Sequence, residues 1–305
     1  MIVRQADSDT MVGGFRAKCM SRLGRMTTII SNTRLTGERA AFGVNDVTVV
    51  DAIFAEGESP LKHSSDVDIR HTLFEWKYPL WYAKRVNMAD SSLLETARSG
   101  LWYVDDITLQ RVLVAAPKTL RRSRHIVMEH VCMADAAETM WSCDDIKMAD
   151  VSVRGDYFGM NSSNIVADGL NLSGNYTFDG GRDIEISNST LLSKDAFWNC
   201  ENVVVRDSTI IGEYLGWNSR NITFINCTVE SLQGLCYIDN LVMRGCKLIN
   251  TTLAFEYSTV DVEIDTTIDS VINPSGGVIK SHGIGELTLD ADCVDVAATT
   301  IITEE

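Results

Sequence analysis

The fold is decided by five segments of one pattern: NIVA (164–167), DIEI (183–186), NVVV (202–205), NITF (221–224) and NLVM (240–243). Each segment places two apolar residues around one variable residue, directly after an Asp or Asn. The first apolar residue, termed the anchor, recurs at one constant spacing: Ile165, Ile184, Val203, Ile222, Leu241 and Val260. A repeat of about 20 residues built on short strands, with no helical period between them, indicates a solenoid.

The same pattern extends toward the N-terminus. Earlier anchors follow at the same or a slightly longer spacing: Val47, Val67, Val86, Ile107, Ile126 and Ile146. Two further apolar columns stand seven positions after the anchors (+7) and six positions before them (−6), as in Leu172 and Phe178. Three short apolar strands per coil, stacked in parallel, predict an all-β, single-stranded right-handed parallel β-helix. It would have roughly 12 coils of about 19–20 residues.

The unbroken repeat implies one elongated domain. We expect residues 26–290 to form the β-helix with its N- and C-terminal caps, because the ends of a solenoid otherwise expose unpaired strand edges. Residues 1–25 carry no repeat, and we expect a disordered or non-native extension there, with Met26 as the natural start. The spacing is lost after about residue 265, and we interpret 291–305 as a C-terminal tail.

The composition is that of an ordinary soluble protein: 305 residues, 45% apolar and 23% charged. The net charge of −15 disfavours nucleic acid and anionic membrane surfaces as partners, because phosphate neutralisation needs clustered Lys and Arg. No apolar run is long enough to span a membrane, and residues 1–25 lack the apolar core of a secretory signal. We therefore expect a cytoplasmic protein.

Eight cysteines lie at positions 19, 132, 143, 200, 227, 236, 246 and 293, and none forms a CxxC pair. Cys227 and Cys246 share one repeat position, a single period apart. We interpret the set as small buried residues of a reducing compartment, with a disulfide framework as the alternative. No Gly-rich phosphate loop, HExxH or GxSxG motif occurs, so we expect neither a metal nor a cofactor.

Position +4 of the coils is often Asp, Asn or His, as in Asp90, His130 and Asn188. Asp and Asn tolerate left-handed backbone and bond their own main chain, so this column predicts a tight turn in every coil. His71 and His130 belong to this structural ladder and are poor candidates for catalysis.

Position −5 holds five of the six tryptophans: Trp81, Trp102, Trp141, Trp198 and Trp217. Coils about 4.8 Å apart would stack Trp81 on Trp102, and Trp198 on Trp217. Because position −6 points inward, a regular strand would point this row outward, where indole faces pack on sugar rings. The alternative is that the tryptophans lie under a loop or turn inward at the strand end.

Positions −8 and −9 run beside this row and carry tyrosines and charges. With the five tryptophans, the candidates for substrate binding are Tyr157, Tyr176, Tyr214, Arg98 and Lys118. A solvated face alone would be rich in Ser, Thr, Lys and Glu rather than Tyr and Trp.

Carboxylates on neighbouring coils form two candidate catalytic pairs: Glu138 with Asp156, and Asp195 with Glu213. Separations of roughly 5 Å across one coil and roughly 10 Å across two bracket the geometries of retaining and inverting glycosidases. Like-charge proximity would raise one pKa of a pair and create a general acid. Lys194, Arg98 or Lys118 would instead serve a lyase that removes the proton α to a uronate. Charges that merely balance one another across coils are the structural alternative.

Several motifs resemble a known family: TGER (36–39), GESPLK (57–62), WKYPLW (76–81), LETAR (94–98), APK (116–118), GDY (155–157), SKDAFW (193–198) and GEYLGW (212–217). They look like the bacterial family DUF3737, over about residues 27–290. The resemblance implies a right-handed β-helix similar in shape to pectin lyases, starting near Met26, and implies no established activity. Some members carry the label hydrogenase-like, which finds no support here because no CxxC pairs exist to hold a nickel-iron centre.

The leading hypothesis is a carbohydrate-active protein that binds, and as a hydrolase or lyase cleaves, an oligosaccharide along the Trp/Tyr row. Its chemistry would centre on Asp195, Glu213, Lys194 and Asp156, with Glu138 as a further candidate. The rival hypothesis is a non-catalytic β-helix that binds a glycan or a protein through the same row, and the row would also suit a homo-oligomer interface.

Overall fold

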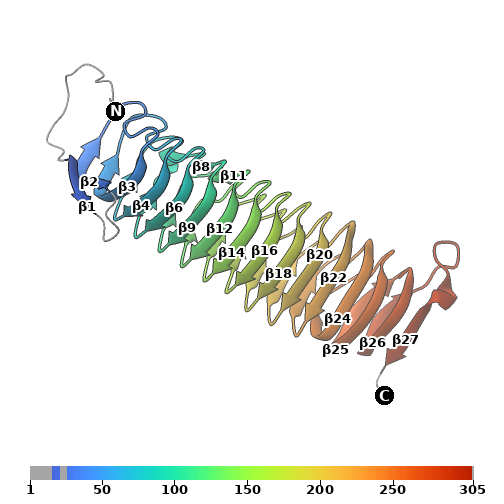
Figure 1. Cartoon of the computed structure of the whole chain (residues 1–305). Coiled ribbons are helices and arrows are strands. Elements are labelled where there is room, and N and C mark those ends of the chain that lie inside the picture. The colour runs from blue at the N-terminus through green and yellow to red at the C-terminus, as the bar shows by residue number, and fades with distance from the viewer. Residues whose placement is uncertain (1–15, 21–25, 304–305) are drawn as a thin grey trace.

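The computed structural model describes residues 16–20 and 26–303, which form one elongated right-handed parallel β-solenoid of about 15 turns (Figure 1). Its strands stack in chain order along a single rod. Every strand of the solenoid pairs in parallel with its counterpart one coil away, as in Ile165 opposite Ile184 and Ile184 opposite Val203. The fold class predicted from the repeat is confirmed.

The anchors lie on the first side of each coil, which carries the long strands. These strands are β2 (Met26–Leu35), β3 (Asn45–Phe54), β4 (Ser65–Arg70), β6 (Lys84–Ala89), β9 (Asp105–Gln110), β12 (Arg124–Glu129), β14 (Asp144–Ala149), β16 (Ser163–Asp168), β18 (Arg182–Ser187), β20 (Glu201–Arg206), β22 (Ser219–Ile225), β24 (Ile238–Ile249), β25 (Thr259–Ile272), β26 (Gly276–Thr288) and β27 (Thr299–Thr303). Alternate residues point inward, so the anchor and the residue two positions later are both buried.

The second side carries the short strands that contain position +7. They are β5 (Leu73–Phe74), β7 (Ser92–Leu93), β10 (Leu113–Val114), β13 (Cys132–Met133), β15 (Ser152–Arg154), β17 (Asn171–Ser173), β19 (Thr190–Leu192), β21 (Thr209–Gly212) and β23 (Thr228–Ser231). In the last coils this strand merges with the long one, as in β24 and β25.

The third side, positions −9 to −4, differs from the prediction of a strand in every coil. In the described part of the chain, regular strands occur there only as β8 (Leu101–Trp102) and β11 (Leu120–Arg121), with a short 3-10 turn, η1 (Glu95–Ala97), nearby. Elsewhere this side is a series of turns, several with left-handed residues such as Met140 and Phe178. The apolar column at −6 is nevertheless buried throughout, because burial of one large side chain per coil does not need a strand.

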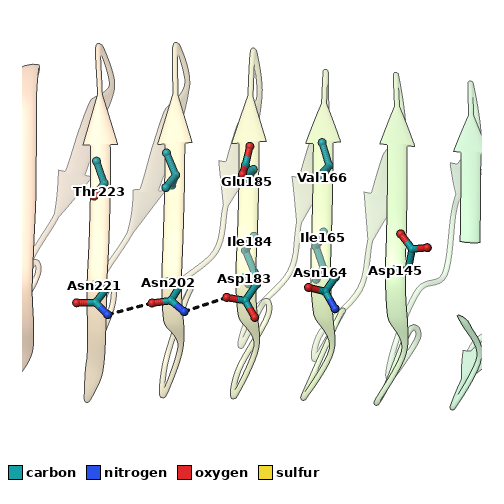
Figure 2. Close-up of a pocket in the computed structure, with 11 residues that line it drawn as sticks. Asp145, Asn164, Ile165, Val166, Asp183, Ile184, Glu185, Asn202, Asn221 and Thr223 are labelled. Carbon is teal, nitrogen blue, oxygen red and sulfur yellow. Dashed lines mark hydrogen bonds between the residues drawn. The ribbon is translucent and has the colours of Figure 1, made fainter. Parts of the chain in front are cut away.

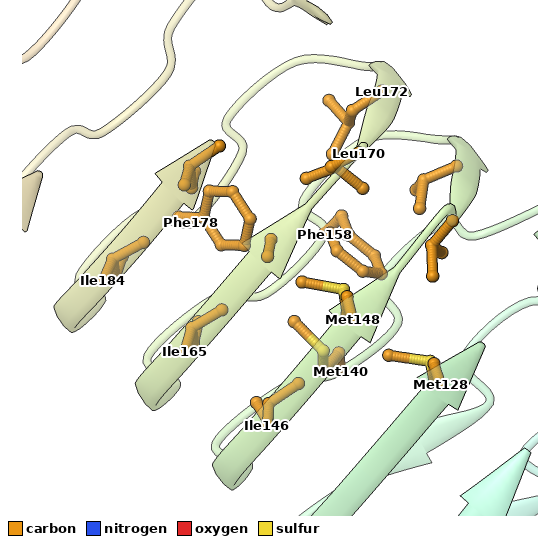
Figure 3. Packing of buried hydrophobic residues seen from close by; sticks show 14 of the residues in the cluster. Met128, Met140, Ile146, Met148, Phe158, Ile165, Leu170, Leu172, Phe178 and Ile184 are labelled. Atoms are coloured by element: carbon orange, nitrogen blue, oxygen red, sulfur yellow. The ribbon is translucent and has the colours of Figure 1, made fainter. Parts of the chain in front are cut away.

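The core is a continuous stack of apolar columns along the rod. Figure 3 shows Met140, Phe158 and Phe178 from the turn side meeting the anchors Ile146 and Ile165 inside the coils. All five of these side chains are 0% exposed. The position +4 column also follows the prediction: Asp90, His130 and Asn188 have φ of 49°, 52° and 50°, in the left-handed region.

Both ends of the rod extend beyond the apolar series found in the sequence. At the N-terminal end, Thr28 of β2 stands opposite Val47 and takes the anchor place with a polar residue. At the C-terminal end, Val260 pairs with Gly277, and Gly277 with Thr299, so the coil there first shortens and then lengthens. About 15 turns rather than roughly 12 therefore result.

The terminal regions are described in part. β1 (Arg16–Met20) pairs antiparallel with β2, while the rest of the extension expected over 1–25 lies outside the described residues. The tail expected over 291–305 contains η2 (Val296–Ala298) and β27, which pairs with β26. Within the described ranges, no helix has the length and hydropathy to cross a membrane.

The cysteines follow the interpretation of small buried residues in five cases: Cys143, Cys200, Cys227, Cys236 and Cys246. Cys132 and Cys293 are exposed, and all seven of these thiols are free.

Candidate functional site

An aromatic ladder runs along the third side in the N-terminal half. We use this name for Lys62, Trp81, Trp102, Arg121 and Trp141, which occupy position −5 of consecutive coils. Trp81 and Trp102 stack with ring centroids 5.2 Å apart and planes 7° apart, as predicted. The Arg121 guanidinium continues the stack, with its carbon 5.0 Å from the Trp102 ring and 4.2 Å from the Trp141 ring. Arg121 was not among the predicted site residues, although its place in the −5 column was the available signal.

Stacking along the rod determines which parts of the indoles face solvent. Each tryptophan of the ladder is half-buried: Lys62 and Trp102 lie against Trp81, Trp81 and Arg121 against Trp102, and Arg121 against one face of Trp141. The indole N–H of Trp102 donates to the carbonyl of Lys118 at 2.6 Å, and that of Trp141 to the carbonyl of Tyr157 at 2.6 Å. The Trp81 and Trp102 faces that would pack on a sugar are therefore occupied, and these two rings present their edges.

A second stack runs beside the ladder at the N-terminal end. It consists of Phe42, His63, Tyr82 and Tyr103, with successive centroids 5.6, 5.0 and 4.6 Å apart. Phe42 and Tyr82 are exposed by 45% and 39%. Sugar-ring packing is again restricted, because the tyrosine faces are matched within the stack.

The ladder is interrupted at Met160 and Asp179 and resumes with Trp198 and Trp217, whose rings stack at 5.6 Å as predicted. Further along the same column, Cys236 and Phe255 are buried, which differs from the expected outward row. The third side is a turn in these coils, so strict inward–outward alternation is not imposed there.

Tyrosines gather at the interruption. Tyr157 and Tyr176 stack at 4.8 Å with planes 4° apart, and Tyr176 meets the Trp198 face edge-on at 5.6 Å. Tyr157 is 37% exposed. The Asp195 cluster, as we name Tyr176, Lys194, Asp195, Trp198, Glu213 and Tyr214, begins at this point. It combines aromatic side chains with both candidate acids of the second pair.

Asp195 has an unusual environment for a carboxylate. Position −8 is Tyr176 one coil earlier and Tyr214 one coil later, so a short side chain stands in a column of tyrosines. Asp195 is only 2% exposed, and its Oδ2 finds no hydrogen-bond partner among the described residues. Burial raises the pKa of Asp195, opposed by the nearby Lys194 cation and reinforced by the Glu213 carboxylate. This carboxyl therefore keeps its proton to a higher pH than an ordinary Asp.

Its neighbour Glu213 has the opposite surroundings. Lys194 Nζ lies 3.2 Å from the Glu213 carboxylate and 5.4 Å from the Tyr214 ring centroid. The hydrogen bond and charge of Glu213 raise the pKa of Lys194, so the ammonium stays protonated. Within one cluster, a buried acid thus lies beside an ion-paired carboxylate.

The other predicted pair, Glu138 and Asp156, differs. The two residues lie on neighbouring coils, with the Glu138 backbone N–H donating to the Asp156 carbonyl. The Glu138 carboxylate, however, turns to Arg121 at 2.7 Å and Lys118 at 3.1 Å. Although partial burial raises the pKa of Glu138, these two cations hold it below the ordinary value. Asp156 is exposed and accepts a hydrogen bond from the Asn175 backbone N–H.

Of the remaining predicted site residues, Arg98 and Lys118 lie on coils away from Asp195, whereas Trp217 contacts the cluster through Trp198 and Tyr214. Arg98 is exposed beside the aromatic ladder, and Lys118 serves Glu138 there. Trp217 closes the row, and its indole nitrogen is buried without a hydrogen-bond partner in the part of the chain that the structure describes. No group of three or more His, Cys, Asp or Glu side chains gathers around a metal-sized space within the described ranges.

A groove on the first side was not predicted as a site. It has a volume of about 480 Å³ and crosses β14 to β22. Figure 2 shows its rim of Asp and Asn side chains, in which Asn221 donates to Asn202 and Asn202 to Asp183, each at 2.9 Å. Glu185 and Val166 lie on the strands beside this rim. The Asp or Asn before each anchor was the available signal. The sequence alone does not show that these side chains line up on the surface, because that follows only from the parallel stacking of the strands.

Comparisons with known proteins give a family and a set of distant folds. A family model described as "Protein of unknown function (DUF3737)" matches residues 28–302, and no curated protein matches the chain. PfbA, a surface adhesin of Streptococcus pneumoniae, is 8% identical over 86% of this chain and 81% of its own, with a TM-score of 0.37. The periplasmic alginate epimerase AlgG is 9% identical (92% and 85% covered, TM-score 0.33), and a polygalacturonase from Erwinia carotovora ssp. carotovora is 11% identical (90% and 82%, TM-score 0.23). Likeness at this level carries nothing about the function of this chain.

Proposed function

Since the chain belongs to the DUF3737 family of proteins of unknown function, we propose a function from its own geometry. The protein binds an oligosaccharide on the third side of the β-helix and hydrolyses a glycosidic bond at the Asp195 cluster. The observation that carries this proposal is the contrast between Asp195, buried with an Oδ2 that has no hydrogen-bond partner among the described residues, and Glu213, held by Lys194.

Two carboxyl groups with different surroundings are what glycoside hydrolysis requires. One must stay protonated to donate to the leaving oxygen, and the other must stay ionised to activate water or attack the sugar. Burial favours the protonated form of Asp195, while the Glu213 carboxylate lies 3.2 Å from the Lys194 ammonium in an ion pair. We assign Asp195 as the general acid and Glu213 as the base or nucleophile.

The same geometry favours a hydrolase over a lyase. A lyase base has to be neutral before it removes a proton, and Glu213 keeps Lys194 protonated. Lys118, the other lysine considered, is held by Glu138. A uronate would also add negative charge beside Asp195 and Glu213 in a chain of net charge −15. We therefore propose a neutral or amino sugar as substrate.

Aromatic contacts to the sugar are assigned to the interruption of the ladder. Tyr157 is exposed there, and Trp198 stacks on Trp217 on one side only, since its contact with Tyr176 is edge-to-face, whereas Trp102 is stacked on both sides by Trp81 and Arg121. Asp195 is 2% exposed, so substrate reaches it only when the side chains that cover it move apart. Binding energy at the aromatic side chains would drive that separation, which is an induced fit.

The test is release of reducing ends from a panel of neutral and amino-sugar oligosaccharides by the full chain. Asp195→Asn and Glu213→Gln should each abolish turnover, and Trp198→Ala should weaken binding. Glu138→Gln and Trp81→Ala are matched controls from outside the cluster and should retain activity. Turnover that survives in both Asp195→Asn and Glu213→Gln would reject the assignment.

A second function is favoured by the covered ring faces of the aromatic ladder. Rings stacked on one another suit a rigid edge-on contact surface, as a non-catalytic glycan- or protein-binding β-helix would need. A ligand that raises the melting temperature by mass action without any turnover would support this function instead.

A further inference from the structure

Cys227 and Cys246 stand opposite each other on consecutive coils. The flanking residues fix the register, with Ile225 opposite Arg244 and Thr228 opposite Lys247. The backbone N–H of Lys247 donates to the carbonyl of Cys227 at 2.9 Å, so the two coils are in direct contact here. Both side chains point into the core and are 1% and 0% exposed.

Serine occupies the same column in the two preceding coils and makes the same hydrogen bond to the backbone. The Ser208 hydroxyl donates to the carbonyl two residues earlier, of Arg206, at 2.6 Å. The Cys227 and Cys246 thiols repeat this contact with Ile225 and Arg244, at 3.3 and 3.4 Å. Since serine satisfies this turn, the hydrogen bond does not by itself require sulfur at either position.

We propose that Cys227 and Cys246 are a redox-active pair that closes into a disulfide between two coils when a peroxide oxidises one thiol. Parallel strands lie about 4.8 Å apart, which falls within the Cα separation of about 4.4–6.8 Å that disulfides span. The remaining buried cysteines are differently placed. Cys200, for example, faces Gly181 and Ser219 in the neighbouring coils and has no cysteine to pair with.

The pair also divides the chemical roles. The neighbouring Cys227 thiol lowers the pKa of Cys246 while burial opposes this, so we assign Cys246 as the sulfur that attacks as a thiolate. Its sulfur attacks the peroxide, breaks the O–O bond and becomes a sulfenic acid, and the released oxygen leaves as hydroxide or alkoxide and takes up a proton. Cys227 sulfur then attacks the sulfenic sulfur, and its proton leaves with the hydroxyl as water. The sum is two thiols and one peroxide giving one disulfide, one water from the sulfenic acid, and a second water or one alcohol from the rest of the peroxide.

Closure would join coils at the end of the tryptophan row. The loop between the two cysteines contains Tyr237, whose ring lies 5.1 Å from the Trp217 ring. A disulfide there restrains the coil that carries Tyr237 against the coil that carries Cys227, independently of whether the Asp195 cluster is catalytic.

The experiment exposes the full-length chain to hydrogen peroxide and follows intact mass and peptide maps. We expect a loss of two hydrogens, a peptide that links Cys227 to Cys246, and a melting temperature several degrees above that of the reduced chain. Cys227→Ser and Cys246→Ser should fold, because serine is native to the column, and should each lose the cross-link and the shift. Cys200→Ser is the matched control and should keep both.

Two results would overturn the proposal. One is a peroxide-treated wild type without the linked peptide, even when the chain is held just below its melting temperature so that the buried thiols are reached. The other is a loss of two hydrogens that persists in Cys227→Ser, since it would belong to other cysteines such as the exposed Cys132 and Cys293. Covalent dimers formed by those two are separated on a non-reducing gel.

Discussion

Replacing Asp195 with Asn should stabilise the folded protein at neutral pH. Burial raises the pKa of this carboxyl above the ordinary value of 3.8 in the folded state. Below pH 3.8 the Asp195 carboxyl is protonated in both the folded and the unfolded chain, so its ionisation does not lower the free energy of unfolding. As pH rises from 3.8 to the raised folded pKa, the unfolded chain releases its proton first, so stability falls across that window and stays lower above it. Asn removes this penalty because it carries no charge.

The size of the effect follows from the surroundings of Asp195. It is 2% exposed and its Oδ2 has no partner among the described residues. A buried polar group left unsatisfied costs about 1–3 kcal/mol, and more when charged. The Lys194 cation offsets part of the charge, and a buried Asn amide has an unsatisfied cost of its own. We therefore expect Asp195→Asn to raise the free energy of unfolding by about 1–2 kcal/mol at neutral pH.

The assay is thermal unfolding, followed by circular dichroism, of wild type and Asp195→Asn at about pH 4 and about pH 8. The variant should melt a few degrees higher at the upper pH and close to wild type at the lower. Glu138→Gln is the matched control, because Lys118 and Arg121 hold that carboxylate, and it should melt lower than wild type at pH 8. A lower melting temperature for Asp195→Asn at pH 8, or an equal gain at both pH values, would refute the reasoning.

Three further substitutions test the packing and the surface charges. Phe178→Ala removes a 0%-exposed core ring and should cost about 3–5 kcal/mol in denaturant unfolding; a loss below about 1 kcal/mol would mean that the core collapses around the gap. Arg121→Leu keeps an apolar stem between Trp102 and Trp141 but loses the cation, and should cost about 0.5–2 kcal/mol and change the tryptophan emission spectrum; an unchanged spectrum would contradict the stacking. The hydrogen bond from Arg124 lowers the pKa of Asp105 to about 2, so the stability that this ion pair adds is fully present above pH 3.8 and is lost as the pH falls through about 2. Asp105→Asn should therefore make the free energy of unfolding fall less steeply with pH on the acid side. A fall as steep as in wild type would argue against the ion pair.

The fold could be predicted because its rule is local and repeated. Each coil has one buried anchor at the same position. Parallel stacking of the coils is the arrangement that places Ile165, Ile184 and Val203 next to one another in the core. The ends were missed for the same reason. Thr28 is polar and Gly277 has no side chain, yet backbone hydrogen bonds hold both in register without an apolar anchor. A search for apolar residues cannot find a strand that is held in the sheet only by backbone hydrogen bonds to the neighbouring strand.

The site could be predicted only as columns. Spacing placed Trp81 over Trp102, because both the column and the coil separation are properties of the repeat. The direction in which a charged side chain turns is set by its partners, which lie on other coils and in other columns. The Glu138 carboxylate pairs with Arg121 and Lys118 and does not face Asp156. The repeat spacing of the sequence does not predict which of these partners a side chain contacts. The third side also lacks the regular strands that would have fixed the alternation.

A repeat supplies its own comparison, and this gives Asp195 its significance. Where positions one coil apart have the same backbone conformation, a residue that departs from its column shows what the local structure does not require. At +4 the Asp and Asn residues agree with their column, and the left-handed turn explains them. At −8, Tyr214 stands one coil after Asp195, and neither has the left-handed backbone that Tyr176 has at φ 53°; the backbone at Asp195 therefore also accepts a tyrosine and does not require a buried acid. A carboxyl that the fold does not need, and whose burial costs stability, is better explained by chemistry than by packing.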